Sequence, residues 1–168
     1  MASRCRGFTL IELIITLMVV GILAAAGASA LTGGAVAFNT TTDSIDTLSK
    51  LRMAVQRMSR EIREIKRNTG GYAITTMQPS ALAFTKADGT QVTIQASGSQ
   101  ASLTYSTVPG TYTLCDQLGS LTFKYYQADD AKAATSASNV AFISVELVLG
   151  SGSGSYAQRT QVALRNGL

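Results

Sequence analysis

The sequence predicts an α+β fold in which one long N-terminal helix packs against an antiparallel β-sheet. An apolar run from Phe8 to Leu31 opens the chain, and apolar residues then recur at three- and four-residue steps from Ile45 to Ile65. Short segments with strand character, separated by turn residues, fill most of the chain beyond Ile65. Helical spacing first and strand spacing afterwards is the pattern of a segregated helix-on-sheet domain.

The apolar run of 24 residues is expected to form a membrane-spanning helix. At 1.5 Å per residue it reaches about 36 Å, enough to cross the hydrocarbon core of a bilayer. Arg4 and Arg6 before the run predict that this end stays cytoplasmic and that the body is translocated. A secretory signal peptide is an alternative, since small residues at 24–26 and 28–30 resemble a cleavage site, although its apolar region would be shorter.

The second half of the helix is expected to be amphipathic. Its apolar face is predicted to hold Ile45, Leu48, Leu51, Val55, Met58, Ile62 and Ile65. Asp43 or Ser44 could cap its start, and the segment Asn68 to Gly71 is a stop signal. The helix is therefore expected to continue to about Arg67.

A β-rich region should cover the apolar face of this helix. The pair Asp88-Gly89 predicts a hairpin between strands at 82–86 and 91–95. The glycine- and serine-rich segment Gly150 to Ser155 is expected to be a flexible turn or loop between the last two strands. Further strands are predicted at 72–77, 102–106, 121–127, 141–149 and 158–164.

Composition argues against an enzyme. The chain has no histidine, which excludes a Ser-His or Cys-His nucleophile and a histidine-ligated metal site, and no cofactor is expected. Cys115 is the only cysteine outside the N-terminal seven residues, and it is most simply a buried small hydrophobe. Asp129 and Asp130 are candidate calcium ligands in a turn, although adjacent turn aspartates are more often solvated.

The net charge of +4 conceals a basic middle. Lys50 to Arg67 holds seven basic side chains against Glu61 and Glu64. Such a face could meet anionic lipid, acidic patches of neighbouring subunits or DNA, or could simply be solvated. Nucleic acid is the less favoured partner, because the segment has no aromatic residue for stacking, but it stays open. The candidate interaction residues are Arg52, Arg57, Arg60, Arg63, Lys66 and Arg67.

The N-terminus carries a more specific pattern. A short basic leader, Met1 to Gly7, precedes Phe8-Thr9-Leu10-Ile11-Glu12, and Gly21 to Ala25 lies further along the apolar run. These features resemble the class III prepilin signal of type IV pilins and pseudopilins, which implies the type IV pilin fold. A plain single-pass anchor would not account for Glu12.

The resemblance also implies roles for three residues. A prepilin peptidase/methyltransferase would cut after Gly7 and methylate the new amine of Phe8. Glu12 would neutralise the N-terminal ammonium of a neighbouring subunit during assembly. A carboxylate in an apolar bundle is tolerable when a cation lies in the same layer.

The body adds a finer resemblance. The run Leu118 to Tyr126, the basic helix from Leu51 to Ile65 and the ending Val162 to Asn166 are similar to minor pilins and J-type pseudopilins. This implies a structural subunit that initiates or decorates a type IV pilus or a type II secretion-like filament. Its partners would be other pilin or pseudopilin subunits, the peptidase and an inner-membrane assembly platform. A tip adhesin or DNA-uptake receptor on the same scaffold is the alternative.

These inferences give an expected organisation of the chain. Residues 1–7 would be a cleaved leader, 8–31 a transmembrane and filament-core helix, 32–69 an amphipathic helix continuing into the body, and 70–168 a β-rich domain. The chain would wait in the bacterial inner membrane with its body in the periplasm or outside, then enter a pilus or pseudopilus. The sequence does not distinguish a pilus from a secretion or competence filament.

Overall fold

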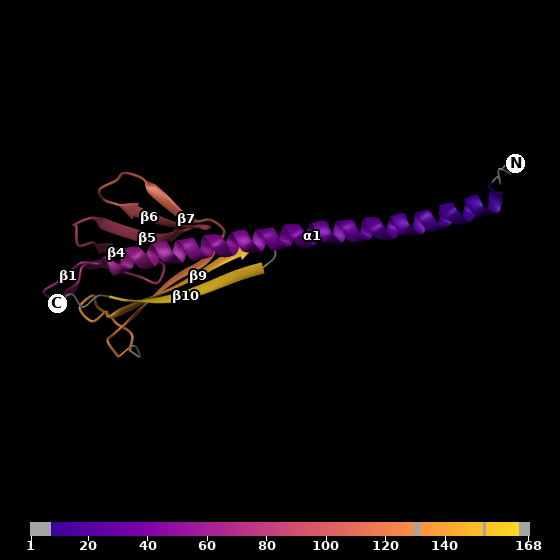
Figure 1. Cartoon of the computed structure of the whole chain (residues 1–168). Coiled ribbons are helices and arrows are strands. Elements are labelled where there is room, and N and C mark those ends of the chain that lie inside the picture. Colours follow the sequence, from indigo (N-terminus) through magenta and orange to yellow (C-terminus); the bar gives the residue numbers. More distant parts are fainter. Residues whose placement is uncertain (1–7, 130–131, 153, 165–168) are drawn as a thin grey trace, which may run out of the picture. The chain divides into compact units, whose positions relative to one another are not determined.

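The fold is α+β, with one long helix and antiparallel sheets, as predicted. The computed structural model describes residues 8–129, 132–152 and 154–164 (Figure 1). It contains two compact units, one up to Thr42 and one from Asp43 onward. The helix α1 (Leu10–Arg63) contributes its first part to the first unit and its last 21 residues to the second.

Within the second unit, α1 buries one face. Leu51, Met58 and Ile62 are at most 1% exposed, and Thr47, Ala54, Val55 and Glu61 complete the buried set. Ile45, which the spacing assigned to this face, is instead 63% exposed. Ile45 lies thirteen residues before Met58. At 3.6 residues per turn, its side chain therefore points about 140° away from that of Met58 around the helix axis. The three- and four-residue steps therefore drift off the buried face at this end.

The helix ends at Arg63, four residues before the predicted end at Arg67. The amides of Glu64 and Ile65 still donate three residues back, to Glu61 and Ile62, which tightens the last turn. The amide of Lys66 then donates to the Thr85 carbonyl at 2.9 Å. The helix therefore ends where the backbone begins to pair with the sheet.

The strands form three antiparallel sheets. A five-stranded sheet has the order β3-β4-β5-β6-β7, a three-stranded sheet the order β10-β9-β8, and β1 pairs with β2. The strand bounds are β1 Arg67–Asn68, β2 Gly71–Tyr72, β3 Ile74–Met77, β4 Ala81–Thr85, β5 Gln91–Ser97, β6 Gln100–Tyr105, β7 Thr111–Cys115, β8 Leu118–Tyr126, β9 Phe142–Ser151 and β10 Gly154–Ala163.

The predicted hairpin at Asp88-Gly89 is confirmed. Thr85 pairs with Gln91, and Gly89 takes a φ of 89°, which favours glycine. The Asp88 carboxylate accepts the Thr90 amide hydrogen at 2.8 Å, and this hydrogen bond lowers the pKa of Asp88. The turn chemistry that identifies the hairpin in the sequence therefore also holds it in the structure.

The structure shortens one predicted turn and adds the strands β1 and β7, which were not predicted. The turn expected over Gly150 to Ser155 is shorter than predicted, because β9 extends to Ser151 and β10 starts at Gly154. In β7, three of the five residues are exposed. Tyr112 and Leu114 alternate with threonines in this strand, so the sequence does carry a short strand pattern there.

The core lies between α1 and both larger sheets. Phe84 and Ile94 of the five-stranded sheet and Val145 and Leu147 of β9 are at most 1% exposed and belong to one cluster with the buried helix residues. Cys115 belongs to the same cluster at 4% exposure, as predicted, and burial raises the pKa of its thiol. A buried thiol of raised pKa carries little thiolate and is unreactive.

Candidate functional site

The helix begins beside the predicted processing position. Phe8 is 79% exposed, and Leu10 is the first helical residue. The amide of Glu12 lies 3.4 Å from the Thr9 hydroxyl and 3.1 Å from the Thr9 carbonyl oxygen, so Thr9 caps the helix. Gly7 lies outside the described residues.

Glu12 therefore has a local role in addition to the predicted assembly role. It occupies the first turn of α1, where a negative charge interacts favourably with the helix dipole. Thr9 and Glu12 have the spacing of a capping box, a serine or threonine followed three residues later by glutamate. This spacing is readable in the sequence and could have predicted where the helix begins.

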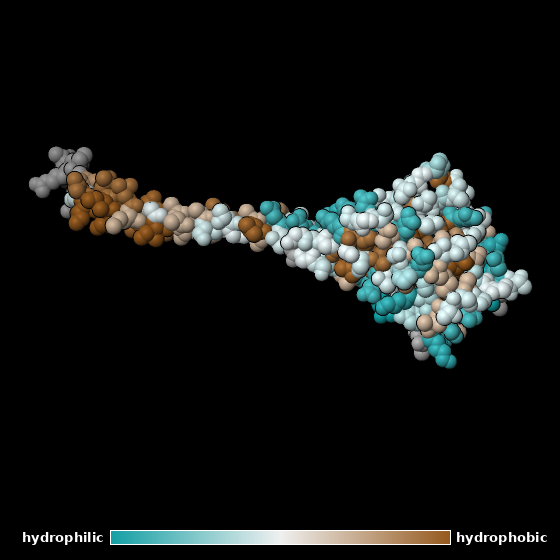
Figure 2. All heavy atoms as spheres, turned by 180° about the vertical axis from the view of Figure 1, so that it is seen from behind, coloured by the Kyte–Doolittle hydropathy of each residue, from teal (hydrophilic) through white to brown (hydrophobic). Residues whose placement is uncertain are grey.

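The first part of α1 is apolar and uncovered within its own unit. Its best 18-residue window has a mean hydropathy of 2.4, and none of that window is buried. Large side chains from Phe8 to Leu23 are 48–79% exposed, and Figure 2 shows them as a hydrophobic surface on the helix. By length and composition this is the one helix in the described chain that could cross a membrane. A continuous apolar surface of this kind needs lipid or partner helices to cover it.

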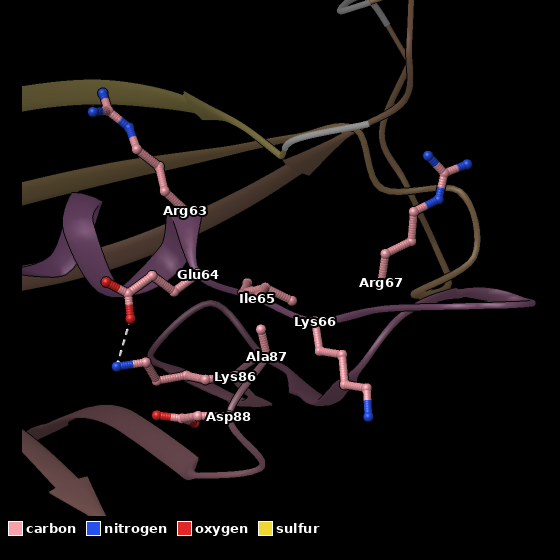
Figure 3. A pocket seen from close by; sticks show the side chains of 8 residues that line it. All are labelled: Arg63, Glu64, Ile65, Lys66, Arg67, Lys86, Ala87 and Asp88. Atoms are coloured by element: carbon pink, nitrogen blue, oxygen red, sulfur yellow. Dashed lines mark ion pairs between the residues drawn. The ribbon is translucent and has the colours of Figure 1, made fainter. Parts of the chain in front are cut away.

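The six predicted basic residues do not form one face. Arg52, Arg60 and Arg63 are exposed on α1, whereas Lys66 and Arg67 follow the helix end. Figure 3 shows the side chains of Arg63 and Lys66 pointing in different directions around a hollow of about 550 Å³. Arg57 is also exposed on α1, and its Nε lies 3.1 Å from the buried Glu61 carboxylate.

Glu61 is the centre of a buried polar network that the sequence pattern did not predict. Its Oε1 accepts a hydrogen bond of 2.8 Å from the Tyr105 hydroxyl, which in turn accepts one of 2.6 Å from Arg57. Its Oε2 lies 3.1 Å from the Lys86 ammonium, an ion pair without hydrogen-bond geometry. The ammonium also lies 2.6 Å from Glu64 (Figure 3).

The network shifts the pKa values of its partners. Pairing with Glu64, followed by pairing with Glu61, raises the pKa of Lys86 against the opposing effect of burial. Burial is the main cause that raises the pKa of Tyr105. The hydrogen bond to Tyr105 raises the pKa of Arg57. Both cations therefore stay charged beside Glu61 through the physiological range.

In the described part of the chain, the calcium candidate Asp129 belongs to no cluster of metal-ligating side chains. Asp129 pairs with Lys132, with 3.7 Å between carboxylate and ammonium, and accepts the Lys132 amide hydrogen. Asp130 lies outside the described residues. Within residues 8–129, 132–152 and 154–164, no three metal-ligating side chains gather in one place.

The comparison with known families agrees with the N-terminal geometry. Residues 2–28 match the family model of the prokaryotic N-terminal methylation motif. No curated protein matches the chain. The chain thus carries a type IV prepilin-like class III signal, joined to a type IV pilin-like α+β architecture. This combination supports a pilin-like or pseudopilin subunit, anchored by its apolar helix in a membrane before assembly. The motif implies processing by a prepilin peptidase, assembly with other pilins and a structural role.

We predict that Glu61→Ala destabilises the β-rich unit by about 3 kcal/mol, because removing one partner of a buried ion pair leaves cations uncompensated. Thermal unfolding of the full chain in detergent, followed by circular dichroism of the strands, would measure this. Glu64→Ala is the matched control, since Glu64 is 46% exposed and should cost about 1 kcal/mol or less. Equal losses in the two variants would contradict the assignment of Glu61 as the centre of the network.

A second prediction concerns alkaline pH. Folding raises the pKa of Lys86 above its ordinary 10.5 and that of Tyr105 above 10.0, so the folded chain holds these protons longer than the unfolded chain. The stability they contribute is complete below these ordinary values and is lost as the pH rises through the folded ones. The unfolding midpoint should fall above about pH 10, and less steeply in Lys86→Met. Lys124→Met, which removes an exposed pair to Glu146, should keep the wild-type slope.

Proposed function

We propose that the chain is a minor pilin or pseudopilin, a structural subunit that initiates or decorates a type IV pilus or a type II secretion-like filament. The observation that carries the proposal is the methylation motif at residues 2–28, which includes the start of an apolar helix with no cover of its own. An apolar helix can exchange lipid for the helices of other subunits without exposing itself to water. The helix would therefore serve first as an anchor and then as filament core.

The proposal assigns a role to each part of the chain. Residues 1–7 are the cleaved leader, 8–31 the transmembrane and filament-core segment, and 32–69 the connection into the β-rich body at 70–168. Arg4 and Arg6 hold the N-terminus in the cytoplasm, so that the body lies in the periplasm or outside the cell. An inner-membrane assembly platform then moves the subunit into the filament.

In this proposal, Glu12 sets the position of each subunit along the filament relative to its neighbour. Its carboxylate lies in the first helical turn, close in sequence to the amine that cleavage would create at Phe8. In a bundle of such helices, the carboxylate of one subunit can pair with the methylated ammonium of the next. Leaving the carboxylate unpaired in an apolar layer is costly, so subunits that enter in the wrong register are disfavoured.

The direct test is quantitative mass spectrometry of sheared surface filaments beside the membrane fraction. A peptide that begins at methylated Phe8, present at a low ratio in filaments, is the expected result for a minor pilin. The same peptide confined to membranes would indicate a pseudopilin. Gly7→Leu is the control that should retain the leader, because a bulky side chain there blocks access of the backbone to the peptidase. An intact Met1 leader on the wild-type chain would overturn the proposal.

We predict that Glu12→Val leaves processing intact but lowers incorporation into filaments about tenfold or more, since one lost ion pair of about 1.4 kcal/mol already changes an equilibrium tenfold. The ratio of filament to membrane signal measures this. Thr16→Val is the matched control, because the Thr16 hydroxyl only donates to the Leu13 carbonyl of its own helix. Wild-type incorporation of Glu12→Val would refute the pairing role.

A further inference from the structure

The strand β10 has an open edge. Among the strands that the structure describes, β10 pairs with β9 alone, in the sheet order β10-β9-β8. The amide of Gly150 in β9 donates to the Gln117 carbonyl on the β8 side. Because backbone groups alternate in direction along a strand, even-numbered β9 residues face β8 and odd-numbered ones face β10. The odd-numbered β9 residues pair with even-numbered β10 residues, as Leu147 does with Gln158. The backbone groups of the odd-numbered β10 residues consequently point away from the sheet.

The free part of this edge covers Ser155, Ala157 and Arg159. In the described part of the chain, no backbone hydrogen bond from outside the strand pair reaches these three residues. The edge also lacks the usual protection against added strands. It is ten residues long, contains no proline and shows no register shift against β9. Its one charged side chain, Arg159, is directed to Ser144 at 3.0 Å and Tyr126 at 3.3 Å on its own sheet.

A basic hollow lies beside the same strand. It measures about 590 Å³ and is bounded by α1 and by Gln158 and Thr160 of β10. Arg60 and Arg63 line it from the helix, and within the described residues neither has an ion-pair partner. Glu64 also lines the hollow, but its charge is compensated by Lys86 at 2.6 Å. Figure 3 shows Arg63 pointing away from that pair.

We propose that β10 accepts an extended acidic segment of a partner protein as an additional strand. Main-chain hydrogen bonds to Ser155, Ala157 and Arg159 would provide affinity. Because side chains alternate along a strand, every second side chain of the added segment would face α1 and enter the hollow beside Arg60 and Arg63. Glutamate or aspartate at those alternate positions matches the two uncompensated guanidinium groups. The partner is therefore a protein segment with carboxylates at every second residue.

This inference deepens the proposed filament role by giving the chemistry of one partner, but its test needs no filament. The full-length chain in detergent micelles is titrated with an acetylated, amidated heptapeptide of alternating threonine and glutamate. Hydrogen exchange resolved to single amides is the main measurement. Exchange at Ser155, Ala157 and Arg159 should slow about tenfold or more at saturation. Exchange at Tyr156 and Gln158, already bonded to β9, should not change.

Charge variants test the hollow separately from the strand edge. The double variant Arg60→Ala/Arg63→Ala should weaken peptide binding about tenfold, and added salt should weaken wild-type binding. Arg52→Ala is the matched control, because Arg52 is exposed on the same helix but does not line the hollow. Equal weakening by Arg52→Ala would overturn the assignment of the hollow.

Backbone variants test strand addition itself. Ala157→Pro removes one outward amide and should abolish peptide binding while the fold persists, because proline is tolerated on an edge whose amide faces solvent. If that variant does not fold, the wild-type chain is titrated with a peptide N-methylated at alternate backbone nitrogens, which should not bind.

Equal binding of the methylated peptide, or no protection of the odd-numbered amides, would overturn the inference. Binding of duplex DNA through Arg60 and Arg63 in place of the peptide would overturn it in favour of nucleic acid. Loss of the filament role with peptide binding intact would refute only the proposed function.

Discussion

The burial of Glu61 is the constraint on which the β-rich unit depends. A carboxylate with 4% of its side chain exposed is tolerable only because Arg57, Tyr105 and Lys86 surround it. These groups come from α1 itself, from the end of β6 and from the residue after β4, so one charge fixes three elements against each other. The apolar contacts of Met58 and Ile62 are less selective about position, since neighbouring registers could bury similar area. The network thus adds specificity to packing that hydrophobic burial alone would leave loosely defined.

The helix α1 serves two different environments within one continuous element. Up to Thr42 its side chains have no cover from their own unit, whereas from Thr47 onward one face is buried against the sheets. The change is set directly by the sequence. An apolar stretch on all sides gives way to a single apolar face with charged residues opposite. Under the proposed function, the first part of α1 would exchange lipid for the helices of other subunits while the β-rich unit stays folded.

The features predicted correctly from the sequence are those with local causes. Apolar spacing identified most of the buried face of α1, and the Asp88-Gly89 pair identified its hairpin, because both depend on neighbours within a few residues. The network around Glu61 could not be predicted, since Lys86 and Tyr105 meet it only through the tertiary fold. In the sequence Glu61 is simply one acid among arginines at helical spacing, a pattern typical of a solvated face. The end of the helix was predicted too late for a similar reason, because the competing strand lies about twenty residues further along the chain. The processing roles of Gly7 and Phe8 are predicted from the N-terminal motif alone. Gly7 and Asp130 lie outside the described residues.

The way α1 ends has a mechanical consequence. The carbonyl of Glu64 accepts the Ala87 amide hydrogen, the Lys66 amide donates to Thr85, and the Lys66 carbonyl accepts the Ala73 amide hydrogen. The ion pairs of Lys86 lie directly beside these bonds. Tension applied along the helix cannot detach it from the sheet by breaking one contact at a time, because the backbone bonds and the ion pairs share the load. The end of α1 is therefore held to the β-rich unit by several bonds that lie side by side.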